Sequence, residues 1–169
     1  MYKLNEKAAF FRIGLQVGVC TVDDVVDWVD SEIASAERPH DLLLDLTLMK
    51  ASNPKEVLSK LQELSSGADN MLALRRVLGE MYPLLQSNSK YGPTFAKGLY
   101  EIFVEFDYDV PEDLTPICAL DDDYSMAIQG TFGTEKAANE GFLDFLEPFF
   151  NKYGSANKAL LQKFKTADR

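Results

Sequence analysis

Residues 53–64 read Asn-Pro-Lys-Glu-Val-Leu-Ser-Lys-Leu-Gln-Glu-Leu, and they carry a complete set of helix signals. Asparagine caps helix N-termini well, proline is favoured at the first helical position, and Glu56 stands at the third position, as in a capping box. The apolar residues that follow recur at helical spacing as far as Leu64, and Gly67 marks the end. A helix with a defined start and stop is therefore predicted here.

The same order of start signal, apolar spacing and stop signal recurs along the chain. Further helices are predicted over about Lys3–Val17, from Thr21 through Ile33, from Pro39 through Met49, over about Asp69–Gln86, from Pro93 through Phe106, over Leu114–Leu120, in a segment that ends near Gly130, from Thr134 through Phe149, and after Ser155. Pro83 is expected to kink or shorten its helix, and Pro148 to bend the end of its helix. No segment alternates convincingly as a strand does. The sequence predicts an all-α fold, a single multi-helix bundle of roughly eight to ten helices, with residues 1–169 forming one domain.

Composition places the chain among globular proteins. Hydrophobic residues make up 46% of its 169 residues and include eleven phenylalanines, enough for a sizeable core. No apolar run approaches the ~20 residues of a membrane-spanning helix. The N-terminal region does not resemble a signal peptide, and Cys20 and Cys118 are expected to be free thiols. We expect a cytoplasmic protein that does not associate with membranes.

The acidic residues are concentrated in two stretches that contain no lysine or arginine. Residues 13–37 hold six acids and residues 98–135 hold ten, whereas all seventeen basic residues and the other eleven acids lie elsewhere. The formal net charge of −10 therefore arises from these two stretches. Such segregation produces a field that attracts a cationic partner and repels nucleic acid and anionic lipid. Nucleic-acid binding is disfavoured on the same ground.

Residues suited to catalysis or to metal binding are few. His40 is the one histidine, and it is expected to be a surface or helix-capping residue. Asp121, Asp122 and Asp123 do not begin a calcium loop, because Met126 and Phe132 stand where that loop needs glycine and glutamate. Helix capping or partner binding is favoured for these three acids. No cofactor, no metal site and no enzymatic activity are predicted.

Two groups of acids, one of them with tyrosines, are the best candidates for a binding site. Tyr108 stands between two acids and Tyr124 follows three, an arrangement that suits binding of arginine or lysine, although both rings could equally pack at the bundle edge. A second group lies three and four residues apart, and hence on one helical face. We expect both acidic stretches to share one negative surface. The predicted partner-binding residues are Asp107, Tyr108, Asp109, Asp121, Asp122, Asp123 and Tyr124, together with Asp23, Asp27 and Asp30.

Several segments resemble a family of small bacterial proteins. They are Phe10-Phe-Arg-Ile-Gly-Leu-Gln-Val-Gly18, Thr21-Val-Asp-Asp-Val-Val-Asp-Trp28, Leu44-Asp-Leu-Thr-Leu48 and Leu120-Asp-Asp-Asp-Tyr-Ser-Met-Ala-Ile-Gln-Gly130. The pattern is similar to that of immunity proteins of contact-dependent inhibition and related polymorphic toxin systems. The resemblance implies a cytoplasmic protein that binds one cognate toxin domain and blocks it. Many such toxins are nucleases and hence basic.

Three functional hypotheses follow. The first is a non-enzymatic immunity protein that neutralises a cationic toxin domain, expected to be a nuclease, through an acidic surface. The second is a helical adaptor or scaffold with no toxin partner, whose acids only solvate its surface. The third is an enzyme with an Asp/Glu site, which an enclosed carboxylate pocket would favour.

Overall fold

A computed structural model describes residues 3–154 and confirms the all-α fold. Within that range the chain forms eight α-helices, one 3₁₀ helix and no strand. None of these helices combines the length and the apolar character needed to cross a lipid bilayer. The elements are α1 (Leu4–Val17), α2 (Val22–Ser35), α3 (Asp41–Thr47), α4 (Pro54–Leu64), α5 (Asn70–Ser87), α6 (Tyr91–Glu105), η1 (Glu112–Leu114), α7 (Ile117–Ile128) and α8 (Glu135–Tyr153).

The predicted helix starts and stops are largely confirmed. Thr21 and Asp24 form a reciprocal capping box at α2, the Asn53 side chain accepts from the Lys55 amide at α4, and the Thr134 hydroxyl accepts from the Ala137 amide at α8. Gly18 ends α1 in the left-handed conformation that glycine adopts most easily. These local signals are short-range, so tertiary packing does not alter them.

Other boundaries differ from the prediction. Helix α3 begins at Asp41, not at Pro39, because His40 is its N-cap and accepts the Leu42 amide proton through Nδ1. Helix α6 begins at Tyr91, before Pro93. Pro83 does not shorten α5, since the helix continues to Ser87 with Leu84 and Leu85 buried. That burial outweighs the roughly 3 kcal/mol that an internal proline costs. The helix predicted after Ser155 lies outside the described residues.

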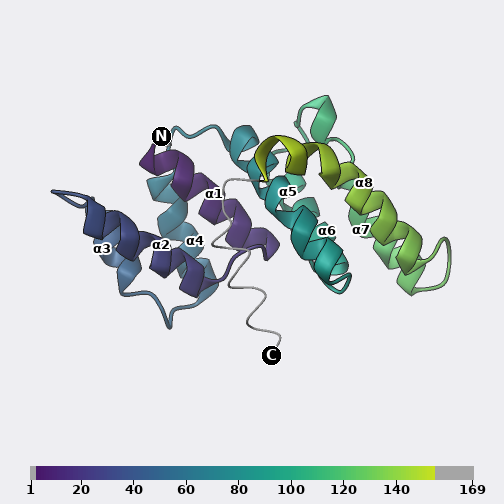
Figure 1. Cartoon of the computed structure of the whole chain (residues 1–169), viewed down its shortest axis with the longest axis horizontal. Helices are drawn as coiled ribbons and strands as arrows, with labels where there is room; N and C mark the ends of the chain where they lie inside the picture. The colour runs from purple at the N-terminus through teal and green to yellow at the C-terminus, as the bar shows by residue number, and fades with distance from the viewer. Residues whose placement is uncertain (1–2, 155–169) are drawn as a thin grey trace.

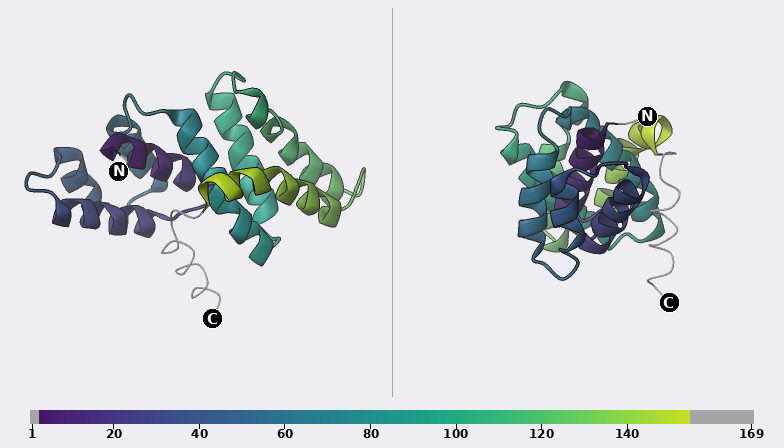
Figure 2. Two further views of the ribbon diagram at one scale, coloured as in Figure 1. Left: turned by 45° about the horizontal axis from the view of Figure 1, so that its top comes forward. Right: turned by 90° about the vertical axis from the view of Figure 1, so that its left-hand side faces the viewer.

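The helices form two groups joined by α1 (Figures 1 and 2). Helices α2, α3 and α4 occupy one end of the longest axis, and α7 and α8 occupy the other. Helix α1 contacts α4, α5 and α6, and α5 packs along α8 while α6 packs along α7. Buried residues from both groups belong to one hydrophobic cluster. The described chain therefore has one continuous core, with α1 in the middle.

Close approach fixes α1 against α6. A Cβ atom on Gly98 of α6 would lie only 2.7 Å from the Cα of Val17, so the two helices touch through backbone at this point. Glycine is the residue that permits such an approach. Ile13 and Val17 of α1 are buried at this contact side of the core, together with Leu99 and Ile102 of α6. The relative placement of the two helices is therefore narrowly determined.

A buried arginine adds a polar link between the same helices. The Arg12 side chain on α1 is only 4% exposed, and its Nη1 donates to Glu105 Oε1 at 2.6 Å. Its Nη2 donates to Asn70 Oδ1 at 3.3 Å, and Gln16 Nε2 donates to the other Glu105 oxygen at 3.0 Å. A buried guanidinium needs such partners because desolvation of an unpaired charge is costly. Glu105 therefore holds the last turn of α6 against α1.

The Arg12–Glu105 pair yields a stability prediction. Replacement of Glu105 by alanine should lower the free energy of unfolding by about 2–4 kcal/mol, because it leaves the Arg12 charge buried without its carboxylate. Urea unfolding followed by circular dichroism measures this loss. Glu101→Ala, one turn earlier and exposed on the same helix, is the control and should change stability by less than about 0.5 kcal/mol. Equal effects of both changes would contradict the role of the pair.

Candidate partner-binding surface

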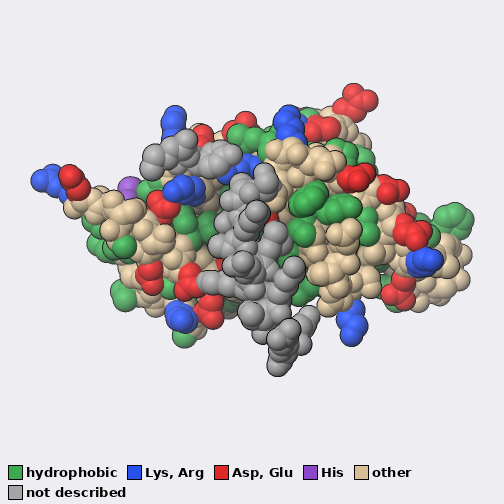
Figure 3. Space-filling view, in the orientation of Figure 1, with side chains coloured by type: hydrophobic (Ala, Val, Ile, Leu, Met, Phe, Trp, Pro, Cys, Tyr) green, Lys and Arg blue, Asp and Glu red, His purple; other side chains and the backbone are tan. Residues whose placement is uncertain are grey.

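The ten residues predicted to bind a partner do not form one site. Asp23, Asp27 and Asp30 are exposed on α2, at the end of the molecule opposite α7 (Figures 1 and 2). Asp30 accepts a hydrogen bond from the Thr47 hydroxyl of α3. On the face drawn in Figure 3, acidic side chains are scattered over both groups of helices with basic ones among them. The expectation that both acidic stretches share one negative surface is therefore wrong.

Tyr124 lies in the core and not on the surface. It is 3% exposed, its ring packs edge-on against Phe142, and its hydroxyl donates to Asn139 Oδ1 at 3.1 Å. Burial, with a smaller contribution from Glu135, raises the pKa of Tyr124 to about 12. The hydroxyl occupies the space that a Cβ on Gly92 would need. Tyr124 cannot offer its ring to a partner, and its predicted place in the site is corrected.

Asp121, Asp122 and Asp123 lie inside a helix and do not cap one. Helix α7 runs without interruption from Ile117 to Ile128, where two separate helices were predicted. Asp122 and Asp123 are exposed, and Asp121 is half-buried. Successive residues on a helix point about 100° apart, so these three carboxylates diverge. They add negative charge to the outer face of α7 but do not converge on one ligand.

Helix α6 separates these acids from Asp107, Tyr108 and Asp109. Tyr124, next to Asp123, reaches Gly92 in the first turn of α6, whereas residues 107–109 follow its last turn. Fifteen residues make α6 about 22 Å long. The two groups of acids therefore lie toward opposite ends of α6. The residues predicted to form one partner-binding centre therefore lie in two separate acidic regions, one in the turn after α6 and one on α7.

The turn at residues 107–109 is the more distinctive of the two regions. Asp107 and Tyr108 both adopt the left-handed conformation, with φ of 53° and 63°. Their amides donate to the carbonyls of Val104 and Phe103, each at 3.0 Å, which closes the end of α6. Glycine usually occupies such positions, because a side chain there is strained. The turn projects Tyr108, which is 60% exposed, between two exposed carboxylates.

Two local rules are broken at this end of α6. The C-terminus of a helix carries partial negative charge, which favours lysine or arginine in the last turn. Here the last turn has no basic residue, and Asp107 and Asp109 follow it at the negative end, whereas Glu105 is paired with Arg12 of α1. Together with the left-handed backbone, this arrangement costs stability. Such costs tend to occur at functional sites, where they are retained for binding.

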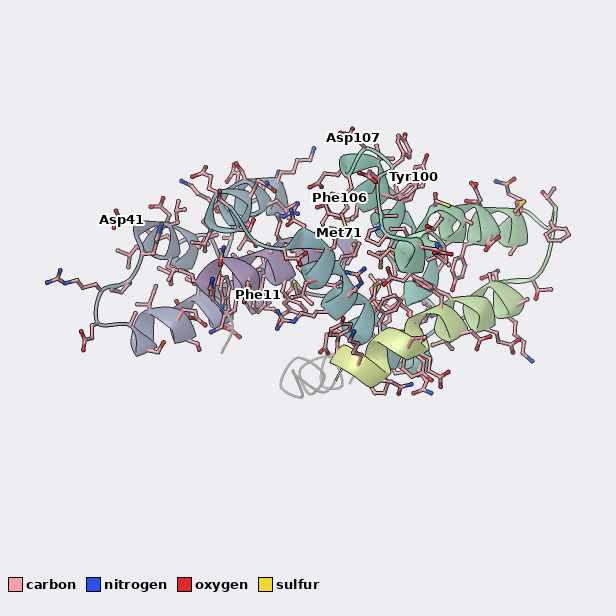
Figure 4. The ribbon with its side chains drawn as sticks, turned by 90° about the horizontal axis from the view of Figure 1, so that it is seen from above. Phe11, Asp41, Met71, Tyr100, Phe106 and Asp107 are labelled. Atoms are coloured by element: carbon pink, nitrogen blue, oxygen red, sulfur yellow. The ribbon has the colours of Figure 1, made fainter. Side chains whose placement is uncertain are left out.

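A row of exposed apolar side chains leads to this turn. Tyr100 and Val104 are 40% and 39% exposed and lie one helical turn apart on α6. Phe103 lies between them and is half-buried, and the Tyr108 ring packs edge-on against it at 5.3 Å. We call Tyr100, Phe103, Val104 and Tyr108 the α6 ridge. Figure 4 shows Tyr100 and Asp107 along the same edge of the molecule, far from Asp41 on α3.

Sequence reasoning missed Tyr100 and Val104, although a signal was present. The apolar residues predicted for this helix were Phe95, Leu99, Ile102, Phe103 and Phe106, and positions 100 and 104 lie outside that set. Polar residues are expected on an outer face, and apolar ones there mark an interaction surface. A test for apolar residues on the outer face would have found them.

The carboxylates beside the ridge have few cationic neighbours. Within residues 3–154, the acids of the 98–135 stretch that form ion pairs are Glu105 with Arg12 and Asp113 with Arg75. No ion pair in that range engages Glu101, Asp107 or Asp109. Lys97 is exposed one turn before Glu101 and is the nearest basic residue along α6. The ridge therefore lies in a region with excess negative charge.

A buried carboxyl, Glu80 of α5, is a separate candidate for chemistry. It is 3% exposed and its Oε2 has no hydrogen-bond partner. Burial raises the pKa of Glu80 to about 7, and Arg76 partly opposes the shift. Within residues 3–154 no three His, Cys, Asp or Glu side chains gather in a way that could hold a metal ion. We interpret Glu80 as a group that links stability to pH.

Comparisons with known proteins identify no relative: no family model, no curated protein and no solved structure matches the chain. The site is therefore interpreted from its geometry and charge alone.

Glu80 leads to a pH-dependent prediction. In the unfolded chain its pKa is near the ordinary value of 4.5, so the folded state binds the proton more tightly. Stability should therefore fall as pH rises from about 4.5 to about 7 and stay lowered above that range, by about 2–3 kcal/mol in all. Glu80→Gln should remove this loss, which urea unfolding at about pH 5 and about pH 8 would measure. A Glu80→Gln protein that keeps the whole pH dependence of the wild type would contradict this assignment.

The turn after α6 leads to a second prediction. Asp107→Gly should raise the free energy of unfolding by about 0.5–1 kcal/mol, because it relieves both the left-handed strain and the unfavourable charge. Asp109→Gly is the matched control, since it removes the same charge near the end of α6, but Asp109 has no positive φ, so glycine there relieves no backbone strain and adds unfolded-state entropy. We expect that change to be destabilising. If both glycine variants lose stability, Asp107 does not carry the strain described.

Proposed function

We propose that this protein is a non-enzymatic immunity protein that binds a cognate basic toxin domain, a nuclease being expected, and neutralises it through an acidic surface. The binding surface is the C-terminal half of α6 with residues 107–109. The protein is proposed to act in the cytoplasm, where such a toxin would reach its substrate. The resemblance of residues 10–18 and 120–130 to immunity proteins supports the same class of function.

The observation that carries the proposal is the exposed Tyr108 held between Asp107 and Asp109 by a strained turn. Neither carboxylate takes part in an ion pair within residues 3–154, and the surrounding stretch 98–135 contains no base. A tyrosine ring beside two carboxylates suits a lysine or arginine, since the ring face attracts the cation and the carboxylates pair with it. Aromatic residues are also common anchors at interface centres.

The proposed mechanism is occlusion. Nucleases bind the phosphates of their substrate with lysine and arginine side chains. The carboxylates of the α6 surface would occupy the positions that those phosphates take and would thereby block substrate binding. The negative field of the stretch would accelerate encounter with a basic domain. The protein needs no catalytic group for this role.

The alternative is a helical adaptor with several partners and no toxin. It is favoured by two other exposed apolar pairs, Leu44 with Leu48 on α3 and Ile128 with Phe132 at the α7–α8 turn. These pairs lie toward opposite ends of the molecule. An adaptor of this kind would bind partners through apolar contacts at these two pairs and at the α6 ridge. Its binding would not depend on charge, whereas the leading proposal requires such dependence.

Neutralisation of two carboxylates tests the proposal. Asp107→Asn/Asp109→Asn should weaken binding of the polypeptide encoded beside this gene at least about 100-fold, because close interfacial charge pairs couple by about 1.5–7 kcal/mol. Asparagine tolerates the left-handed conformation, so the fold is preserved. Isothermal titration measures the affinity, and survival of cells that produce the toxin measures protection. Binding of the wild type should also weaken with salt, because exposed charges are screened beyond about 8–10 Å.

Asp122→Asn/Asp123→Asn on α7 is the matched control. It removes the same charge from exposed positions toward the other end of α6, so only long-range attraction should change, by less than about tenfold. An acidic binding surface would be excluded if the affinity of the wild type did not change with salt and both double variants bound as tightly as the wild type. Greater loss in the α7 variant would move the site to α7.

A further inference from the structure

The α6 ridge leaves apolar side chains partly exposed at the surface of the described chain. Tyr100 and Val104 are exposed, and Phe103 connects them to Tyr108 through the edge-on ring contact. The opposite face of α6, with Phe95, Leu99 and Ile102, is fully buried in the core. The helix is therefore apolar on two sides, which a free surface helix is not. Apolar residues gathered in a row at an exposed face mark an interaction site.

The spacing of the row is that of a helix-packing surface. Tyr100 and Val104 stand four residues apart on one face of α6, and Tyr108, in the turn that follows the helix, extends this surface through its ring contact with Phe103. Ridges of this kind pack into the groove between residues three and four apart on a second helix.

An extended peptide fits this face less well. Residues 3–154 contain no strand whose edge could pair with it. An extended backbone laid on the ridge would lose water from its amide and carbonyl groups without gaining hydrogen-bond partners. A helix satisfies these groups internally. The occupant is therefore helical.

Charge on one flank and at the end of the ridge determines the rest of the chemistry. Glu101 lies beside the row on α6, on the same side as Glu105, which is paired with Arg12, and Asp107 and Asp109 surround the end of the row. A second copy of this chain would place the same acids opposite one another, so a symmetric dimer through this face is repelled. A helix with lysine or arginine along one edge of its apolar stripe is complementary.

We infer that the α6 ridge is the docking site for a basic amphipathic helix of the partner protein, packed along Tyr100, Val104 and Tyr108. The inference rests on the proposed function for the cationic nature of the partner and adds its secondary structure and its apolar anchor. The flanking carboxylates orient the helix and increase its rate of encounter, whereas the ridge supplies the buried contact that slows dissociation.

The test uses the full chain and three synthetic cationic peptides of equal charge and about 18 residues, long enough to form a helix when bound. One has leucines at helical spacing among lysines, the second has the same composition with alternating leucines, and the third is oligolysine. Fluorescence anisotropy of labelled peptides gives the affinities. The helical-spacing peptide should bind at least about tenfold more tightly than the other two.

Two protein variants locate the binding. Tyr100→Ser/Val104→Ser should abolish the preference for the helical-spacing peptide and leave oligolysine binding unchanged. Leu44→Ser/Leu48→Ser is the matched control, because Leu44 of α3 and Leu48, the C-cap of that helix, have the same spacing and are more exposed, at 46% and 83%. It should retain the preference. Circular dichroism checks that both variants keep their helical content, as expected for exposed positions.

Four results would overturn the inference. Equal affinities for all three peptides would show that binding depends on charge alone. The proposed function would then stand, but the inference that the partner docks as a helix would be rejected. Absence of binding by any cationic peptide would remove both. A preference lost in the α3 variant would place the site on α3. Equal competition by a synthetic peptide of residues 155–169, which carries Lys158, Lys163 and Lys165, would assign the ridge to the chain's own C-terminal segment.

Discussion

Burial of α1 on nearly all its sides is the constraint on which the rest of the structure depends. Eight of its fourteen residues are buried, and among them is the charged Arg12. Helices α4, α5 and α6 surround α1, and each contributes to the same core. A helix enclosed in this way must satisfy its polar groups internally or through specific partners. The Arg12 Nη1 and Nη2 atoms are satisfied by Glu105 and Asn70, whereas the buried Nε has no hydrogen-bond partner, and the pair with Glu105 fixes the end of α6 at the same time.

The candidate binding surface is a consequence of this arrangement. Contact between Gly98 and the backbone of Val17 fixes which side of α6 faces inward. Position 100 and position 104 must then face outward, whatever residues occupy them. Since Glu105 is held by Arg12, the chain leaves α6 at a defined place, and the left-handed turn directs Tyr108 away from the core. A rigid core thus presents the strained turn, as a precise binding site requires.

Unfavourable residues are compensated in the core but not at the surface after α6. The core tolerates Pro83 inside α5 and a carboxyl at Glu80, because packing on both sides supplies more stability than either residue removes. On the surface, by contrast, Asp107 and Asp109 after the end of α6 take part in no ion pair within residues 3–154. This uncompensated loss of stability suggests a partner, because contacts made in a complex can offset the unfavourable charge and backbone strain at this turn.

The helical class and most helix ends could be predicted from sequence because caps and apolar spacing act within a few residues. Thr21, Asn53 and Thr134 begin helices as their side chains predict. The break predicted at Asp121 was wrong for a reason of the same kind. Three consecutive acids resemble a helix start, but the spacing of Ile117, Leu120 and Tyr124 continues one apolar face, and burial of that face decides the local structure.

What the sequence alone determined is the all-α class, the helix caps and the uneven distribution of charge, all of which depend on neighbouring residues. Only the tertiary structure decided which acids lie together. The packing of α1 against α6 places α2 and α7 toward opposite ends of the molecule, so their acids are far apart. It also decided that Tyr124, on the inner face of α7, is buried over Gly92, while Tyr108, in the turn after α6, is exposed, although both tyrosines stand beside acids in the sequence. Long-range packing, which no local pattern encodes, makes that choice.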